Sequence, residues 1–238
     1  MGVFFKQLRA GVNFAAGDAV AKQMANYAYV IGDTATGKAL IVDPAYAPGE
    51  LLEITQNEGF EPQGIILTHF HADHAGGTLY ADSHPPIPGI KELLEIAAVD
   101  IHVQNAEAEW LEKTTGVGKD SLRLHDSGDQ IELGNTKITL IRTPGHTPGS
   151  QCILLENAIL TGDTLFLRGC GRSDLPGADP GDLYDSLRML ATKLPADIKV
   201  YAGHDYDKDP CQSLSSLLQS NPVLWDMPKE TWVRKFGG

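Results

Sequence analysis

Three of the eight histidines of this chain lie within six residues, in the segment His69-Phe70-His71-Ala72-Asp73-His74. The five residues before it, 64–68, form a short apolar run rich in β-branched side chains, which predicts a buried strand. The segment 75–77, Ala-Gly-Gly, would let a helix start close behind the loop. Imidazole nitrogens and a carboxylate suit zinc, iron or manganese, and the loop has no thiolate of the kind that closes a structural zinc site. The pattern predicts a metal site where a strand ends; histidines that are merely solvated in a loop are the alternative.

The His-x-His-x-Asp-His run resembles the first metal-binding motif of the metallo-β-lactamase-fold superfamily, which implies three further ligands at strand ends, in the order His, Asp, His. Three residues of this chain fit that order, and each follows an apolar run with glycine beside it or nearby. They are His146 after the run 138–141, Asp163 after 158–159, and His204 after 198–201. Together with the first loop, this order of ligands at strand ends resembles the motifs of the metallo-β-lactamase-fold superfamily. The resemblance covers residues 20–215, nearly the whole chain.

The resemblance implies an α+β fold, the metallo-β-lactamase-type αββα sandwich of two mixed β-sheets flanked by helices. A length of 238 residues suits one domain that spans residues 1–238. Since only 34 residues follow His204, we expect no separate C-terminal helical domain of the kind that full-length glyoxalase II carries.

Periodicity and turn residues predict where the individual elements lie. Strands are expected at 26–32, 38–43, 64–68, 101–103, 131–133, 136–141, 151–155, 158–160 and 198–201. Helices are expected at 48–59, 91–98, 106–113, 182–194 and 210–219, with one more directly after the histidine loop. Asp73 or a neighbour could cap that helix, which is the structural alternative to metal binding by this carboxylate. Prolines 85, 86 and 88 make residues 80–88 irregular.

Composition excludes several classes of protein. No apolar run approaches the roughly 20 residues that span a bilayer, and the N-terminus lacks the pattern of a signal peptide. The three cysteines are odd in number and share no CxxC spacing, so we expect no disulfide framework and a cytoplasmic location. The net charge is −12 and no basic stripe is present, so nucleic acid and membranes are not expected partners.

The resemblance also assigns the ligands. His69, His71 and His146 would hold one metal ion; Asp73, His74 and His204 would hold a second; Asp163 would bridge the two. Two divalent ions, zinc first and iron or manganese as alternatives, would share a hydroxide that acts as the nucleophile, with Asp73 and Asp163 as the catalytic carboxylates. All seven positions are filled, which argues against a non-enzymatic binding module, and the missing export signal argues against a β-lactamase.

The segment 161–174 narrows the family further. It resembles the loop that glyoxalase II enzymes and persulfide dioxygenases carry, and both groups act on glutathione derivatives. We therefore predict hydrolysis of a thioester of the hydroxyacylglutathione type. The alternative is an iron-dependent glutathione persulfide dioxygenase with one Fe(II) on His69, His146 and Asp163, which the segments 168–174 and 204–206 resemble more closely. A hydrolase of another small ester, thioester or lactone is the third interpretation.

Three residues are predicted to bind the small-molecule substrate. Arg168 and Arg172 could clamp a carboxylate, although one of them could instead pair with Asp174. Tyr206 could donate to the substrate or merely pack. The long insert 80–100 is expected either to overhang the metal site or to pack on a second subunit of a homodimer. Residues predicted only to pack, to form an interface or to lie at the surface are Trp110, Trp225, Trp232, Cys170, His84, His102 and His125.

Overall fold

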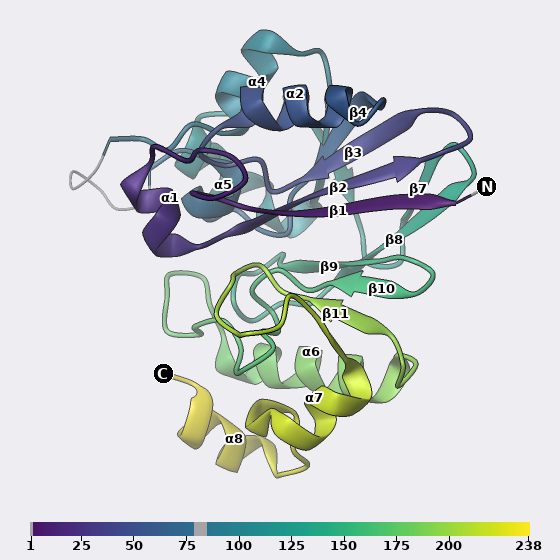
Figure 1. Ribbon diagram of the computed structural model, residues 1–238. Coiled ribbons are helices and arrows are strands. Elements are labelled where there is room, and N and C mark those ends of the chain that lie inside the picture. Colours follow the sequence, from purple (N-terminus) through teal and green to yellow (C-terminus); the bar gives the residue numbers. More distant parts are fainter. Residues whose placement is uncertain (1, 79–84) are drawn as a thin grey trace.

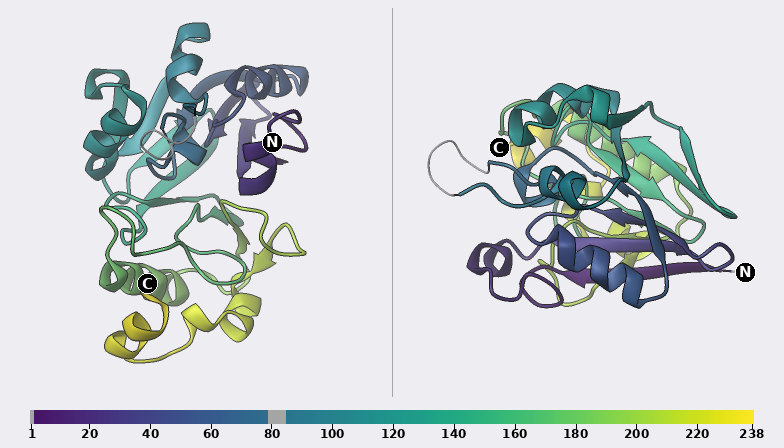
Figure 2. Two further views of the ribbon diagram at one scale, coloured as in Figure 1. Left: turned by 90° about the vertical axis from the view of Figure 1, so that its left-hand side faces the viewer. Right: turned by 90° about the horizontal axis from the view of Figure 1, so that it is seen from above.

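The computed structural model describes residues 2–78 and 85–238. Two six-stranded sheets pack face to face, and helices cover the outer face of each sheet (Figure 1). The left-hand view of Figure 2 looks onto the end of the strands where connecting loops gather, and it shows the same layers. The predicted α+β sandwich is therefore confirmed.

The first sheet has six strands in chain order. They are β1 (Val3–Arg9), β2 (Tyr27–Asp33), β3 (Lys38–Val42), β4 (Glu61–Ile66), β5 (Asp100–Gln104) and β6 (Leu122–His125). The β1, β2 and β3 strands are antiparallel, whereas β3 to β6 run parallel. Because Val42 pairs with Ile66 in parallel register, β3 and β4 end side by side and release Asp43 and the histidine loop at the same edge.

The second sheet contains the remaining strands. They are β7 (Gln130–Leu133), β8 (Thr136–Arg142), β9 (Gln151–Leu154), β10 (Ala158–Leu160), β11 (Lys199–Tyr201) and β12 (Gln212–Ser213). The three later candidate ligands, His146, Asp163 and His204, follow β8, β10 and β11 respectively. The two sheets meet at this edge, where the Tyr27 amide donates to the Gly203 carbonyl at 2.8 Å and the Gln151 amide donates to the Thr68 carbonyl at 2.9 Å.

Strand periodicity explains the layers. On β2, Tyr29 and Ile31 face the second sheet and pack with Leu140 of β8, whereas Ala28 and Val30 face the helices. All five side chains are buried. A strand whose two faces are both covered needs apolar residues at every position, and this is why β2 has an unbroken apolar core.

Helices complete the outer layers. On the first sheet lie α2 (Pro48–Asn57), α4 (Ile90–Ile96) and α5 (Ala108–Thr115); on the second lie α6 (Pro180–Lys193), α7 (Leu214–Ser220) and α8 (Lys229–Phe236). Two short helices, α1 (Ala19–Met24) and α3 (Ala72–Ala75), lie near the loop end of the strands. Trp232 anchors α8, since it is fully buried and its indole donates to the Val223 carbonyl at 2.8 Å. Of the helices that the structure describes, none is long and apolar enough to cross a membrane.

Several predicted elements were wrong. The helix expected after the histidine loop is the single turn α3, which already begins at Ala72 and ends at Gly76, where φ is 86°. Asp73 lies inside that turn and does not cap it, because no side chain makes the cap hydrogen bond. The predicted helix 210–219 starts only at Leu214, after the short strand β12, and β1, α1, β6 and α8 were not predicted.

The insert was also misinterpreted in part. Its residues 79–84 lie outside the described residues, but from Pro85 onward it packs into the protein's own core. Ile87, Ile90 and Leu93 are buried with residues of α2, and none of the insert's described residues lines the cavity at the predicted metal site. The described part therefore supports the fold and does not overhang the site; the homodimer stays a prediction.

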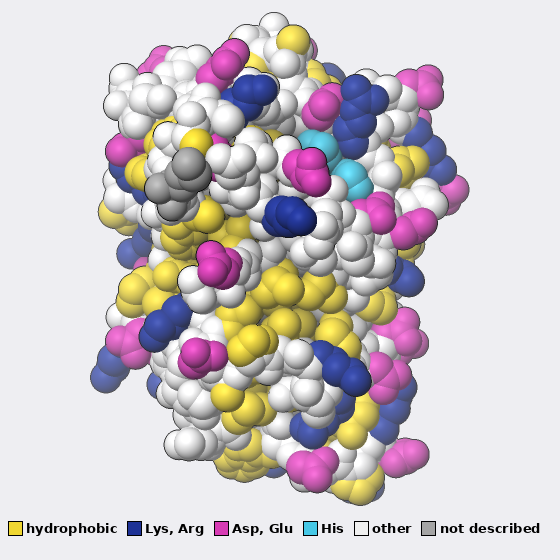
Figure 3. All heavy atoms as spheres, turned by 90° about the vertical axis from the view of Figure 1, so that its right-hand side faces the viewer, with side chains coloured by type: hydrophobic (Ala, Val, Ile, Leu, Met, Phe, Trp, Pro, Cys, Tyr) yellow, Lys and Arg dark blue, Asp and Glu magenta, His cyan; other side chains and the backbone are white. Residues whose placement is uncertain are grey.

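The end of the strands opposite the loops carries a second hollow between the layers. Figure 3 shows this end, where hydrophobic side chains gather across the middle of the face. Val3, Leu154, Pro195 and Ile198 line the hollow, with Lys137 and Glu156 beside them.

A histidine pair on the first sheet predicts a pH-dependent stability. His102 on β5 and His125 on β6 approach within 2.9 Å between Nδ1 and Nε2. Burial and then the neighbouring His125 lower the pKa of His102 from 6.5 to about 4. Because the folded-state pKa is the lower one, this histidine contributes stability above pH 6.5 that is lost as the pH falls toward 4.

The His102→Gln variant is therefore expected to lose less stability than the parent between pH 7.5 and pH 4.5. The difference should be about 1–3 kcal/mol in the free energy of unfolding, measured by urea titration at both pH values. Equal losses in the two proteins would contradict the prediction.

Candidate metal centre

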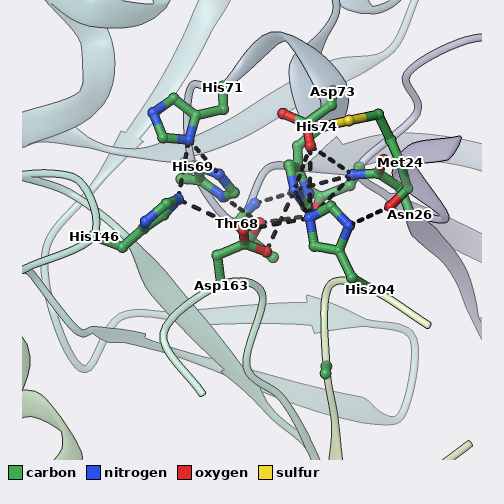
Figure 4. Close-up of polar contacts among 12 residues, drawn as sticks. Met24, Asn26, Thr68, His69, His71, Asp73, His74, His146, Asp163 and His204 are labelled. Atoms are coloured by element: carbon green, nitrogen blue, oxygen red, sulfur yellow. Dashed lines mark hydrogen bonds and ion pairs between the residues drawn. The ribbon is translucent and has the colours of Figure 1, made fainter. Parts of the chain in front are cut away.

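The structure brings all seven predicted ligand side chains together at the loop end of the two sheets (Figure 4). Their ligand atoms form three overlapping groups, each with its atoms within 4.8 Å of one another. The groups are His69, His71 and His146; His69, His74 and Asp163; and Asp73, His74 and His204. We call His69, His71 and His146 the first cluster, and Asp73, His74 and His204 the second cluster. Both are mostly buried.

Asp163 lies between the clusters. Its Oδ2 is 3.6 Å from His146 Nε2 on one side and 3.3 Å from His204 Nε2 on the other, and its Oδ1 is 3.4 Å from His74 Nε2. One carboxylate thus faces both groups of imidazoles, which is the geometry that a bridging ligand needs.

Backbone and carboxylate acceptors fix the orientation of three imidazoles. The contacts of their Nδ1 atoms are His146 to the Arg172 carbonyl at 2.7 Å, His204 to the Met24 carbonyl at 2.8 Å, and His74 to Asp43 Oδ2 at 2.9 Å. Because these oxygens only accept, each Nδ1 is the protonated donor in the neutral ring, and the Nε2 lone pair points inward.

His69 is fixed through a hydroxyl relay. The Thr68 hydroxyl donates to Asp43 Oδ2 at 2.6 Å, so its oxygen accepts from His69 Nδ1 at 3.0 Å. This leaves His69 Nε2 as an inward lone pair, 3.1 Å from His71 Nδ1.

The inward nitrogens fit divalent cations. His146 Nε2 lies 3.0 Å from His71 Nδ1, and His74 Nε2 lies 3.2 Å from His204 Nε2. The facing Nε2 lone pairs of His74 and His204 repel at this distance unless a proton or a metal cation lies between them. Asp163 Oδ1 is buried and accepts no hydrogen bond, so it too has a lone pair available for a cation. Imidazole and carboxylate donors suit zinc, iron and manganese.

The pKa shifts of the ligand side chains also indicate that the site favours positive charge among its carboxylates. Burial would raise the pKa of Asp163, but His204 and His74 outweigh it and hold the pKa well below its usual range. Burial would lower the pKa of His74, but Asp73, Asp163 and Asp43 raise it to about 10. A metal ion would replace this proton as the positive charge among the carboxylates. Burial and then its histidine neighbours hold the pKa of His69 well below its usual range.

Asp43 was missed by the sequence analysis. It follows β3 in the left-handed region, with φ of 53°, and its carboxylate accepts from the Thr68 amide at 2.8 Å as well as from the hydroxyl. The available signal was a carboxylate directly after a buried strand that neighbours the histidine strand. Its contacts with His74 and Thr68 make it the acceptor that orients one imidazole in each cluster.

Asn26 and Tyr46 were missed as well. The Asn26 amide donates to Asp73 Oδ2 at 3.0 Å, and the Tyr46 hydroxyl donates to Asn26 Oδ1 at 3.0 Å. Both side chains are buried. They orient the Asp73 carboxylate from segments far from it in sequence, and neither carries a local motif.

Glu107 is the third missed residue. It is fully buried, and its carboxylate accepts from the Phe70 amide at 3.0 Å, the Gly149 amide at 2.6 Å and the Thr147 hydroxyl. Phe70 lies between two ligands of the first cluster and Thr147 follows the third. Glu107 thus ties together the two loops that supply this cluster. Burial outweighs the three donors and raises the pKa of Glu107 to about 7.

The Glu107→Gln variant is expected to hold metal at the first cluster about 10–100-fold more weakly than the parent, the range seen when groups that support metal ligands are removed. The amide keeps the volume but has only one acceptor oxygen for the two backbone donors. Competition with a chelator measures the affinity. Glu109→Gln, an exposed neighbour, is the control; equal retention of metal in both variants would show that the tie is dispensable.

The predicted substrate-binding residues fare differently. Arg172 lines the cavity, but its guanidinium pairs with Asp174 at 2.9 and 2.8 Å. Pairing with Asp174 was the alternative to a carboxylate clamp for one of the two arginines. Arg168 does not line the cavity and lies 3.5 Å from Asp207 with an exposed side chain. Tyr206 lines the cavity, half-exposed, with its ring stacked on His204 at 4.7 Å between centroids. Contact of Arg172 and Tyr206 with substrate stays a prediction.

The cavity at the metal centre has a volume of about 850 Å³, within the usual range for small-molecule sites. Trp110, predicted only to pack or to form an interface, lines it together with Phe70. Cys170 also lines the cavity. Burial raises the pKa of its thiol to about 12, so the thiol stays protonated, as expected of a packing residue and not of a thiolate nucleophile.

The comparison with known proteins agrees with this geometry. The sequence profile of the Metallo-beta-lactamase superfamily matches residues 22–204. The chain belongs to this superfamily. It is 35% identical over 211 residues to a hydroxyacylglutathione hydrolase of Erwinia tasmaniensis, covering 89% of this chain and 70% of that protein.

Two further relatives match over more of their own length. The chain is 30% identical to BaeB of Bacillus velezensis, named a probable polyketide biosynthesis zinc-dependent hydrolase, with 87% of this chain and 85% of that protein covered. The crystal structure of ETHE1 from Myxococcus xanthus superposes with a TM-score of 0.76 at 28% identity, over 98% of this chain and 89% of that one. These matches place the chain in the glyoxalase II and persulfide dioxygenase branch of the superfamily.

Proposed function

We propose that the protein hydrolyses a thioester of the hydroxyacylglutathione type with two divalent metal ions, zinc in the first instance. The observation that carries the proposal is the second cluster. Asp73, His74 and His204 form a complete donor group beside the first cluster, with Asp163 between the two. This second set of oriented, buried donors supports a site for two ions.

When bound, the two ions would supply a hydroxide with a pKa near neutrality and polarise the thioester carbonyl. The chain's own residues keep the donors in place. Asn26 holds Asp73 on the cavity side, and Asp43 holds His74. Tyr206 stands over His204 with its hydroxyl available to donate to the substrate. A thiolate leaving group needs little protonation, so the site does not require a strong general acid.

A second candidate function is the iron-dependent dioxygenation of a glutathione persulfide. The observation that favours it is the match to ETHE1. This match covers 89% of the ETHE1 chain, whereas the match to the hydroxyacylglutathione hydrolase covers 70% of that enzyme. In this alternative, one Fe(II) would use only His69, His146 and Asp163.

Metal analysis of protein purified without added metal, combined with two assays, tests the proposal. We expect two zinc ions per chain and hydrolysis of S-lactoylglutathione without oxygen uptake. One iron per chain, with oxygen uptake on glutathione persulfide and no thioester hydrolysis, would overturn the proposal in favour of the dioxygenase.

A further inference from the structure

An aromatic wall begins at the first cluster and runs away from it along the cavity. The Phe70 ring meets the His71 ring edge-on at 4.7 Å, and its other face is stacked on Trp110 of α5 at 5.2 Å and 19°. Both aromatic residues line the cavity. The indole is held in turn by Lys113, whose ammonium lies 5.1 Å from its centroid.

The loop after Asp174 forms the opposite wall. Leu175 and Pro176 line the cavity, and the next residue, Gly177, is so close to Trp110 that a Cβ there would lie 2.9 Å from the indole. Gly177 also has φ of 84°, which favours glycine. The loop is thus fitted against the indole. We call the space between Phe70, Trp110, Leu175 and Pro176 the apolar slot.

The two ends of the cavity suit different parts of a thioester. The apolar slot offers rings and aliphatic side chains. Of the two cations that line the cavity among the described residues, Lys113 lies over the indole and Arg172 is paired with Asp174, so the slot is a poor match for the several charges of a glutathione-like peptide. The other end, at Tyr206, lies at the surface, where 53% of the tyrosine is exposed. A bulky, polar thiol carrier fits that open end, because it can remain in water there.

We infer that the apolar slot is an acyl-binding subsite, which selects thioesters whose acyl group is an apolar alkyl chain or an aryl group. The inference rests on the thioester hydrolysis of the proposed function and changes its preferred acyl group. A small polar acyl group such as lactoyl would leave the slot filled with water, so it should be hydrolysed less efficiently than an apolar one. Each methylene buried there should raise kcat/KM about fourfold, until the slot is full.

The test uses zinc-loaded protein and S-acyl-N-acetylcysteamine thioesters with acetyl, butanoyl, hexanoyl and octanoyl groups. We expect kcat/KM to rise from acetyl to hexanoyl in the parent by about sixteenfold if two of the four added methylenes are buried, and by up to about 250-fold if all four are. Trp110→Ala should remove most of this rise, and Trp110→Phe should restore part of it. Trp225→Ala, which removes an exposed indole outside the cavity lining, is the matched control.

A binding measurement separates the two proposals. S-hexyl-N-acetylcysteamine, a thioether that cannot be hydrolysed, should quench tryptophan fluorescence of the parent and of Trp225→Ala, and much less of Trp110→Ala. If no thioester is hydrolysed but the thioether binds at Trp110, the proposed function fails and the slot stands. If hydrolysis occurs without dependence on chain length, or Trp110→Ala weakens all acyl groups equally, the acyl subsite is wrong and the slot holds the thiol carrier.

Discussion

The Asp163→Ala variant is expected to lose thioester hydrolysis by at least about a thousandfold, because without the carboxylate between the clusters the site would no longer hold two ions that together activate the hydroxide and polarise the carbonyl. Asp163 is the carboxylate that faces ligands of both clusters, at 3.3–3.6 Å. Its loss should therefore lower the metal content as well as the rate. Metal per chain and kcat/KM on S-lactoylglutathione are the two measurements.

A matched control and an isosteric variant sharpen this test. Asp174→Asn removes an exposed carboxylate that pairs with Arg172 and lies, like Asp163, between β10 and α6. This variant should keep the parent's metal content. Asp163→Asn keeps the shape but not the charge, and should fall between the alanine variant and the parent. Full metal content and full activity in Asp163→Ala would refute the bridging role.

The convergence of the ligands could be predicted from the sequence because of how strands end. The histidine loop follows β4, and His146, Asp163 and His204 each follow a strand of the second sheet. Residues that leave neighbouring strands at one edge are brought close by the sheets themselves, whatever the lengths of the connections. The order of ligands that the family resemblance implies, together with short apolar runs and adjacent glycines, therefore located the site.

The residues that orient the ligands could not be found in this way. Glu107 follows β5 and contacts the loops after β4 and β8, and Asn26 precedes β2 and contacts Asp73. Their partners are set by the packing of one sheet on the other, so nothing in the neighbouring sequence marks them. Buried polar side chains of this kind must be paired, but only tertiary structure shows with what.

The same reason explains the errors in local structure. The pair of glycines after the histidine loop was interpreted as room for a helix to begin, yet both have positive φ and end one. A side chain at Gly76 would lie 2.5 Å from Gly89. The requirement for glycine comes from a segment that is distant in sequence. The insert 80–100 was likewise expected to overhang the site or to pack on a second subunit, whereas its residues Ile87 and Leu93 fill the core beside α2.

The His71→Ala and His74→Ala variants separate the two leading chemistries. Each side chain belongs to a different cluster, and neither is among the three ligands of the mononuclear alternative. In a dinuclear hydrolase, each variant should lose about one metal ion per chain and at least about a hundredfold in kcat/KM, since the nucleophile needs both ions. His125→Ala, a histidine outside the cavity lining, is the control.

His71 gives the more decisive result of the pair. It is only partly buried, whereas His74 is fully buried and hydrogen-bonded to Asp43, so His74→Ala also removes a structural contact. A His71→Ala protein that unfolds at the parent's temperature but has lost one zinc and its hydrolysis supports the two-metal thioesterase. If it instead retains a single iron and consumes oxygen with glutathione persulfide as the parent does, the second cluster does not serve catalysis and the protein is a dioxygenase.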